Sequence, residues 1–463
     1  MGGSGDLSQR KLLPALLDLY TRGKLPDVFH IIGFARSPRT HDEFREFVKK
    51  AINTHDTSHE HPEETVNGFC ERVSYVAGSF DDESSYHSLS EALASFDTEH
   101  SVATNKLFYL AVPPKYYGQI FSDLKDTSVA DEAPDRWTHI LVEKPFGHDL
   151  ETAQELDQKL ASLYREDQIF RIDHYLAKEA VQNILSFRFA NTLLQASWNK
   201  DSVESVHIKM HEKIDVGDRT GFYEGVGALR DVGQNHLLQI LALVALREPQ
   251  EFTVDAVRAA RSEVLEALAP ADLEKLNETI VRAQYECYEA KTDSGEDSQT
   301  ETYFSLKTKI NLPEWEGVPF CIEAGKALAE AEVSVTIKLK DVATGLFETK
   351  SCLSVGNEIK LTISPEQTID ITLNAKSPGL GYQLETRTLS FTCQKGEEEI
   401  KNSYEKVLYD SIIGDQTLFT QTSEVLAAWK YITPILENWH TLPLHTYEKG
   451  SNGPDVTLAN QGT

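Results

Sequence analysis

The chain has 463 residues, enough at about 150 residues per domain for two or three domains with a sizeable core. Its 40% hydrophobic and 25% charged residues are typical of globular proteins and exclude collagen, a disulfide-stapled miniprotein and a wholly disordered chain. The formal net charge of −28 argues against a nucleic-acid partner, because phosphate backbones bind basic surfaces.

The first third of the chain alternates between helix and strand patterns. Helical spacing of apolar residues predicts helices over 12–20 and 151–163, and short apolar runs predict strands over 28–34, 107–112 and 139–142. Because helices separate these strands, we expect crossover connections and a parallel sheet. The segment 1–172 is therefore predicted to be a Rossmann-like dinucleotide-binding domain.

The remainder, 173–463, has a different pattern. Apolar and polar residues alternate over 206–210, 333–340 and 369–373, which predicts a large, mostly antiparallel sheet with one buried face, and 302–312 is compatible with it. Helices are expected over 229–246 and 423–439. The stretch 291–302 contains no apolar residue and is predicted to be a mobile loop. The fold class is thus α/β followed by α+β, and the second domain is expected to close over the substrate.

No membrane partner is expected. The longest apolar stretch, 237–246, contains Gln239 and is shorter than the roughly 20 residues that span a bilayer. The N-terminus has no apolar signal-peptide core. Five cysteines at wide spacings without a CxxC pair indicate reduced thiols, no zinc site and a cytoplasmic location.

Glycines open the sequence as Gly2-Gly3-Ser4-Gly5 and lead into the first predicted helix. Such glycines let the backbone approach a pyrophosphate at the positive end of a helix, although a flexible tail has the same composition. Only Met1 precedes them, so the first strand of a Rossmann sheet is expected to be missing. Its loss would leave unpaired backbone groups and an open core at the binding crevice.

Arg36 and Ser37 follow the strand predicted over 28–34. An NAD enzyme usually has Asp or Glu here for the ribose 2′-hydroxyl, whereas Arg suits a 2′-phosphate. The alternative is a solvated loop arginine.

Two histidines lie in segments whose residue types suit a binding or catalytic site. A helix starting near Asp173 would put His174 and Lys178 on one face, and with Tyr175 they could bind a phosphate monoester. The alternative is a capped surface helix. His236 lies at the start of an apolar helix and is either a satisfied core histidine or a base oriented by a carboxylate.

Several strings resemble the glucose-6-phosphate dehydrogenase family and occur in that family's order along nearly the whole chain. They are GGSGDLSQRKLLPALLDLY, IIGFARS, FYLAVPP, EKPFG, RIDHYLAKEAVQN, LRDVGQNHLLQ and WEGVPFCIEAGKAL. RIDHYLAKE is the specific match, and EKP occurs in other sugar oxidoreductases as well. The resemblance implies oxidation of glucose 6-phosphate at the anomeric carbon to the 6-phosphogluconolactone, with hydride transfer to NADP and with NAD as a secondary cofactor.

The resemblance also implies roles for individual residues. His236 would be the general base and Asp173 its orienting carboxylate. Substrate-binding residues would be His174, Tyr175, Lys178, Glu212, Asp231, Lys326 and Lys144. Cofactor-binding residues would be Gly2, Gly5, Asp6, Leu7, Lys11, Arg36, Tyr117 and Lys144, and no metal is expected. Pro145 would link the two sites.

By resemblance the chain would form a homodimer or homotetramer. Two other functions stay open. One is a different NAD(P)-linked sugar oxidoreductase, which the EKP string permits. The other is a catalytically inactive nucleotide-binding protein, which the missing first strand suggests.

Overall fold

The computed structural model describes residues 1–55, 61–288, 298–341, 356–381, 384–392 and 402–456. The chain divides into two compact units, each of which is described by itself. The first unit comprises Met1–Ala177 and Glu398–Thr422, and the second comprises Lys178–Glu397 and Ser423–Thr463. The domain boundary between residues 172 and 173 stays a prediction. The late segment Glu398–Thr422 belongs to the first unit.

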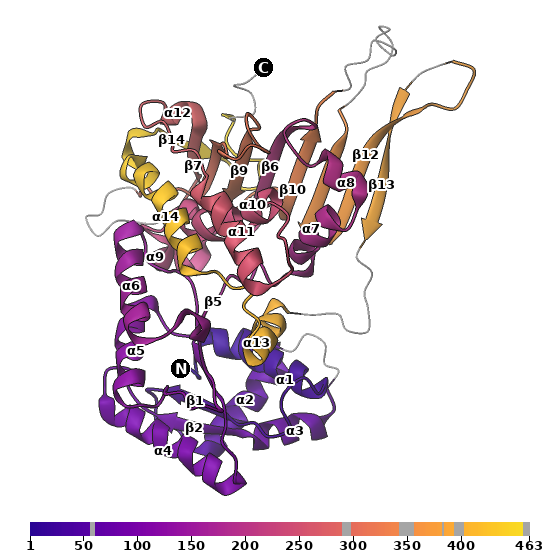
Figure 1. Ribbon diagram of the computed structural model, residues 1–463. Coiled ribbons are helices and arrows are strands. Elements are labelled where there is room, and N and C mark those ends of the chain that lie inside the picture. Colours follow the sequence, from indigo (N-terminus) through magenta and orange to yellow (C-terminus); the bar gives the residue numbers. More distant parts are fainter. Residues whose placement is uncertain (56–60, 289–297, 342–355, 382–383, 393–401, 457–463) are drawn as a thin grey trace. The chain divides into compact units, whose positions relative to one another are not determined.

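The first unit is an α/β structure (Figure 1). Its strands are β1 (Ile31–Ala35), β2 (Val73–Ala77), β3 (Lys106–Leu110), β4 (Thr138–Val142) and β5 (Ile169–Arg171). Its helices are η1 (Ser8–Leu12), α1 (Leu13–Thr21), α2 (His41–His55), α3 (Glu63–Glu71), α4 (Glu83–His100), η2 (Pro114–Tyr116), α5 (Tyr117–Asp126), α6 (Leu150–Leu163), η3 (Glu166–Gln168) and α13 (Ser403–Ile413). The predicted helices and strands of this half are confirmed, while β2 and β5 were not predicted.

All strand pairs of the first unit are parallel, which confirms the Rossmann-like architecture. β1 pairs with β2, and β3, β4 and β5 pair in that order. In the described residues these are two separate sheets, with no strand between β1 and β3.

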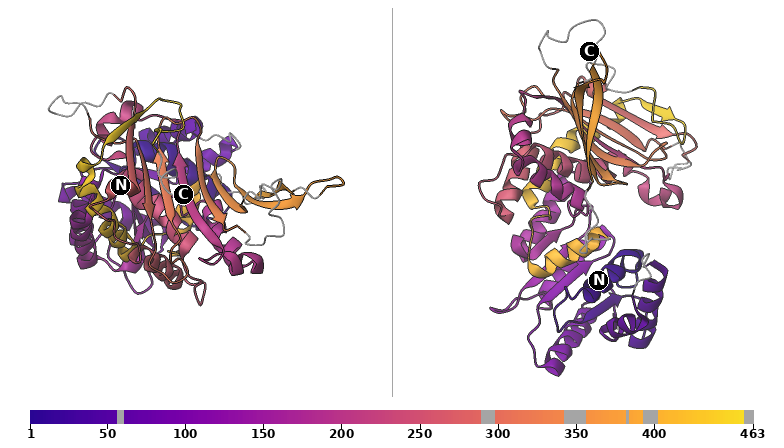
Figure 2. Two further views of the ribbon diagram at one scale, coloured as in Figure 1. Left: turned by 90° about the horizontal axis from the view of Figure 1, so that it is seen from above. Right: turned by 90° about the vertical axis from the view of Figure 1, so that its right-hand side faces the viewer.

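The second unit is built on one large sheet (Figures 1 and 2). In the described residues it has nine strands in the order β13-β12-β11-β10-β6-β9-β8-β7-β14. Their bounds are β6 (Val203–His211), β7 (Ile280–Tyr285), β8 (Tyr303–Thr308), β9 (Phe320–Gly325), β10 (Glu332–Leu339), β11 (Glu358–Ser364), β12 (Thr368–Lys376), β13 (Leu384–Thr392) and β14 (Leu444–Tyr447). The pairs β6–β9 and β7–β14 are parallel and the others antiparallel, as the predicted fold class requires.

Helices cover one face of this sheet (Figure 2). The helices of this unit are α7 (Glu179–Phe189), α8 (Thr192–Ser197), η4 (Gly217–Arg219), α9 (Thr220–Tyr223), η5 (Leu229–Leu237), α10 (Leu238–Ala245), α11 (Val254–Glu266), α12 (Leu276–Thr279), α14 (Thr422–Glu437) and η7 (Trp439–Thr441). α10 is buried along its whole length, in agreement with the apolar stretch in the sequence. No helix in the described ranges has the length and apolarity needed to cross a membrane.

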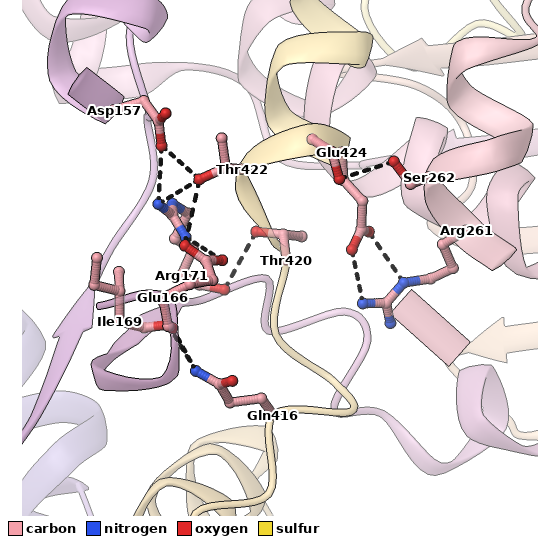
Figure 3. Close-up of polar contacts among 11 residues, drawn as sticks. Asp157, Glu166, Ile169, Arg171, Arg261, Ser262, Gln416, Thr420, Thr422 and Glu424 are labelled. Carbon is pink, nitrogen blue, oxygen red and sulfur yellow. Dashed lines mark hydrogen bonds and ion pairs between the residues drawn. The ribbon is translucent and has the colours of Figure 1, made fainter. Parts of the chain in front are cut away.

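Hydrogen bonds and a buried ion pair tie late segments of the chain to earlier ones (Figure 3). In the first unit the Arg171 guanidinium contacts Asp157 at 3.1 Å and Glu166 at 2.8 Å, and Thr420 donates its amide to the Arg171 carbonyl at 3.1 Å. In the second unit Arg261 of α11 and Glu424 of α14 form an ion pair at 3.0 Å, with both side chains fully buried. The contacts of Thr420 and Glu424 each join segments that are far apart in the sequence.

We expect Glu424→Ala to lower the free energy of unfolding by about 3–5 kcal/mol, because it leaves the buried Arg261 charge uncompensated. Urea and thermal denaturation followed by tryptophan fluorescence would measure the loss. The double change Arg261→Met with Glu424→Leu is the control and should recover most of the stability. A single variant as stable as the parent chain would contradict this role of the pair.

Candidate active site

The glycine-rich turn of the first unit sits at the carboxyl ends of β1 and β3. Gly2 has a φ of +76°, and a Cβ there would lie 2.2 Å from the Ala111 carbonyl oxygen. A Cβ on Gly3 would lie 2.7 Å from the Gly33 Cα, so only glycine fits at either position. The backbone then enters a helical turn at Asp6 that continues into η1. The turn and the helix start form a cradle that fits a dinucleotide pyrophosphate.

The other predicted cofactor residues of this unit differ in exposure. Asp6, Lys11 and Arg36 are exposed, and Leu7 is half-buried. Donation by the Ser79 hydroxyl and the nearby Arg36 charge hold the pKa of Asp81 below its usual value, so Arg36 and Asp81 lie close together. Arg36 therefore presents its guanidinium to solvent at the end of β1, where an adenosine ribose would bind in a Rossmann fold.

Tyr117 has its ring buried in the core. Its hydroxyl donates to the Glu143 carbonyl oxygen at 2.9 Å, directly before Lys144 and the cis peptide bond to Pro145. In the structure Tyr117 thus supports the EKPFG loop, and its contact with a cofactor stays a prediction.

Glu143 is the centre of a buried polar cluster that the sequence analysis did not identify. Tyr109 donates its hydroxyl to the carboxylate, and Tyr404 makes a second hydrogen bond. Burial raises the pKa of Glu143, and the charge of Asp173 adds to this rise. Glu143 and Asp173, at the ends of the neighbouring strands β4 and β5, are therefore close enough to interact. Because Glu143 directly precedes Lys144, these hydrogen bonds also restrict the backbone at Lys144.

The segment from Asp173 to Lys178 is a tight turn and not the start of a helix. Tyr175 donates its amide to Asp173 Oδ1 at 3.0 Å, and Leu176 donates to the Asp173 carbonyl at 3.1 Å. The expected helix begins at Glu179, with Lys178 as its N-cap. The helical prediction for 173–178 was wrong because the Asp173 side chain bonds to the backbone two residues later, which favours a turn.

In the second unit, the parallel pairing of β6 and β9 brings distant residues together. His211 pairs with Gly325, so the residues that follow, Glu212 and Lys326, emerge side by side. The Lys326 ammonium lies 2.5 Å from Glu212 and 3.4 Å from Asp231, although it is only 5% exposed. It also lies 5.5 Å from the centre of the Tyr223 ring. Three of the predicted substrate residues thus form one cluster.

Asp231 and His236 both belong to η5, a π-helix. Bonds from residue i to i+5 widen its turns, so two side chains five positions apart lie closer to one face than they would in an α-helix. The substrate-side carboxylate and the predicted base are therefore held by one rigid element.

Glu301 anchors the start of η5 and was missed by the sequence analysis. Its carboxylate accepts hydrogen bonds from the Leu229 amide and the Trp439 indole, each at 3.0 Å, and burial raises its pKa. It belongs to the stretch 291–302 that was predicted to be a mobile loop. Residues 291–297 lie outside the described residues, whereas Ser298, Thr300, Glu301 and Thr302 are buried, so the prediction was wrong for this end of the stretch.

The structure brings together Glu212, Asp231 and Lys326 and places His236 on the helix of Asp231. Asp173, His174 and Tyr175 belong to the first unit, and Lys178 and His236 to the second. The pairing of His236 with Asp173, and a phosphate site formed jointly by His174, Tyr175 and Lys178, therefore stay predictions.

Comparison with known proteins covers the whole chain. The family profile "Glucose-6-phosphate dehydrogenase, NAD binding domain" matches residues 1–183, and "Glucose-6-phosphate dehydrogenase, C-terminal domain" matches residues 185–460. Glucose-6-phosphate 1-dehydrogenase of Chlamydia pneumoniae is 36% identical, with 98% of this chain and 92% of that protein aligned. The Kluyveromyces lactis enzyme of the same name is 37% identical, with 100% and 90% aligned.

A solved structure, "Glucose-6-phosphate dehydrogenase in complex with its substrate glucose-6-phosphate", superposes with a TM-score of 0.90 at 36% identity. The superposition covers 100% of this chain and 96% of that one. The chain belongs to the glucose-6-phosphate dehydrogenase family.

Proposed function

We propose that the chain oxidises glucose 6-phosphate at the anomeric carbon to 6-phosphoglucono-1,5-lactone, with NADP as the hydride acceptor. The observation that carries this proposal is the cluster of Glu212, Asp231 and Lys326 beside the helix of His236, in a chain that aligns end to end with a substrate-bound relative. Two carboxylates and an ammonium are acceptors and a donor for sugar hydroxyls.

The reaction removes a proton from the anomeric hydroxyl and a hydride from the anomeric carbon. The C–O bond between this carbon and this oxygen becomes a C=O bond. His236 takes the proton, since a neutral imidazole can accept a proton near neutral pH. Asp173 holds the other ring nitrogen and stabilises the imidazolium. The bound dinucleotide supplies the hydride acceptor.

Each remaining residue has a binding role. His174, Tyr175 and Lys178 bind the sugar phosphate, while Glu212, Asp231 and Lys326 orient the ring hydroxyls. Lys144, held by the Glu143 cluster, reaches both the sugar and the nicotinamide. Gly2, Gly5, Asp6 and Leu7 form the pyrophosphate cradle, and Lys11, Arg36 and Tyr117 complete the cofactor site, with NAD accepted less well than NADP.

We further propose a homodimer or homotetramer that works in the cytoplasm. Leu373 of β12 and Leu389 and Phe391 of the edge strand β13 are exposed by 39%, 61% and 59%. Because paired positions place Leu389 and Phe391 opposite Ile371 and Ile369, these apolar side chains share one face of the sheet. An exposed apolar edge of this kind favours association through the sheet.

The proposal is tested by incubating the protein with glucose 6-phosphate and NADP and following the absorbance of the reduced nicotinamide. Reduction with the phosphorylated sugar is expected. Activity with free glucose alone would favour another sugar oxidoreductase, and cofactor binding without turnover would favour an inactive nucleotide-binding protein.

His236→Asn is expected to lower kcat by roughly 100- to 10,000-fold, the usual contribution of a general base, with little change in dinucleotide affinity. Steady-state kinetics and cofactor fluorescence titration measure the two effects. The exposed His148→Asn serves as the matched control. Unaltered turnover would remove His236 from the base role.

Lys178→Ala is expected to raise the KM for glucose 6-phosphate by about 10- to 100-fold, because a charge-assisted hydrogen bond to the phosphate is lost. Its kcat/KM for free glucose should change little, since free glucose has no phosphate. Lys125→Ala is the control. Equal losses with both sugars would reject a phosphate-binding role.

Arg36→Ala is expected to lower kcat/KM for NADP by about 10- to 100-fold and to leave the value for NAD within a few-fold, because only NADP carries the 2′-phosphate. Arg39→Ala is the matched control. If the two cofactors lose equally, Arg36 does not bind the 2′-phosphate.

A further inference from the structure

The backbone of Lys326, at the end of β9, is held by two residues that are far away in the sequence. The Lys326 amide donates to the Thr302 carbonyl at 3.0 Å, and the Lys326 carbonyl accepts a hydrogen bond from the Tyr447 hydroxyl at 2.7 Å. Thr302 directly precedes β8, and Tyr447 ends β14, the edge strand that pairs with β7 (Figure 1). Both backbone groups of Lys326 are thus fixed from outside β9.

The hydroxyls of Thr302 and Tyr447 form a hydrogen-bond chain with a defined direction. The Tyr285 amide donates to Thr302 Oγ1 at 2.9 Å, and Thr302 Oγ1 lies 2.9 Å from the Tyr447 hydroxyl oxygen. A tyrosine hydroxyl has one proton to donate. Its distance to the Lys326 carbonyl is 2.7 Å, against 3.3 Å to the Thr302 carbonyl. Tyr447 therefore donates to Lys326, and Thr302 donates to Tyr447.

The chain of hydroxyls lies in a buried part of the second unit. Thr302 and Tyr447 are both buried, and the Tyr447 ring packs against the rings of Tyr285 and Tyr303 with centroids 6.3 Å and 5.9 Å apart. Burial raises the pKa of Tyr447, so its hydroxyl keeps the proton at neutral pH. Because water does not replace a lost partner at such a place, each of these hydrogen bonds is costly to remove.

The residue after Lys326 has an unusual backbone conformation. Ala327 has a φ of +54°, in the left-handed region that residues other than glycine rarely adopt. Its amide donates to the Ile214 carbonyl at 3.1 Å, and its carbonyl accepts from the Gly450 amide at 2.7 Å. Such a conformation persists only where surrounding contacts maintain it. The late segment that contains Tyr447 and Gly450 therefore holds both Lys326 and Ala327.

These contacts set the point from which the Lys326 side chain extends. Its ammonium contacts Glu212 and Asp231, but the flexible stem of a lysine would allow other positions of the ammonium if the backbone moved. The neighbour of Thr302, Glu301, holds the start of η5, the helix of Asp231. Two consecutive residues thus hold the elements that carry Lys326 and one of its carboxylate partners.

We infer that Tyr447 is a positioning residue for the cluster of Glu212, Asp231 and Lys326. Its hydroxyl holds the Lys326 carbonyl, and Thr302 orients that hydroxyl. Tyr447 acts through Lys326 and not by contact with the sugar. The inference rests on the proposed function only in the role that it gives to the cluster, since the hydrogen-bond chain exists without substrate.

Tyr447→Phe removes the hydroxyl and keeps the ring. We expect it to lower kcat/KM for glucose 6-phosphate by about tenfold, because the Lys326 ammonium is displaced, and to leave the KM for NADP within about twofold. Tyr285→Phe is the matched control. Both tyrosines are 4% exposed, and the Tyr285 hydroxyl accepts from the Val216 amide at 3.2 Å instead of contacting Lys326. Similar thermal midpoints with different kinetics would separate positioning from stability.

A second pair of variants tests the donor of the chain. Thr302→Val keeps the shape but removes the hydroxyl that orients Tyr447, whereas Thr302→Ser keeps the hydroxyl. We expect the valine variant to lose kcat/KM by about fivefold and the serine variant to stay within about twofold of the parent chain. The double variant Thr302→Val with Tyr447→Phe should lose less than the product of the separate losses, because both changes act on one contact.

The position of the ammonium is measured without substrate by acylation with acetic anhydride, followed at each lysine by mass spectrometry. Lys326 is buried and ion-paired, so it should react slowly in the parent chain and in Tyr285→Phe. In Tyr447→Phe we expect its acylation to be at least about fivefold faster, because the ion pair loosens. The exposed Lys338 is the internal reference.

Unchanged acylation of Lys326 in Tyr447→Phe would overturn the inference. So would an unchanged kcat/KM, or equal kinetic losses in Tyr447→Phe and Tyr285→Phe, since a general loss of stability would then explain them. If the parent chain does not oxidise glucose 6-phosphate, the proposed function fails, and the acylation rates still decide whether Tyr447 positions Lys326.

Discussion

The site proposed in the second unit depends on one interaction, the contact of the Lys326 ammonium with the carboxylates of Glu212 and Asp231. A buried cation is stable only when opposite charges compensate its lost hydration, and two carboxylates from different elements do so here. The site's two carboxylates and one ammonium place hydrogen-bond acceptors and a donor side by side. The parallel pairing of β6 with β9 and the π-helix η5 bring the three side chains together.

The first unit depends on a constraint of a different kind, the close approach of backbone to backbone. Gly2 and Gly3 pass so near Ala111 and Gly33 that a single Cβ would not fit. The same residues link β1 to β3 and lead into the helix whose positive end suits a pyrophosphate. One turn therefore links the two sheets and forms the cradle proposed for the cofactor.

Predictions from periodicity held where the pattern was long and failed where a local contact competed. The alternating stretches over 206–210, 333–340 and 369–373 became β6, β10 and β12, because period-two apolar patterns are strong signals of a half-buried sheet. β5 has three residues and was too short to detect. The turn at Asp173 replaced a predicted helix, because a side-chain hydrogen bond to the Tyr175 amide favoured it.

The sequence by itself determined the fold class, the order of the elements and the family, since these rest on apolar periodicity and on strings that are read locally. Only the tertiary structure decided that Glu212, Asp231 and Lys326 meet, that Glu301 anchors η5 and that Glu143 is a buried acid. These features depend on strand order and on burial. Glu301 shows the reason: a stretch without apolar residues resembles a solvated loop until the buried amide and indole that bind its carboxylate are known.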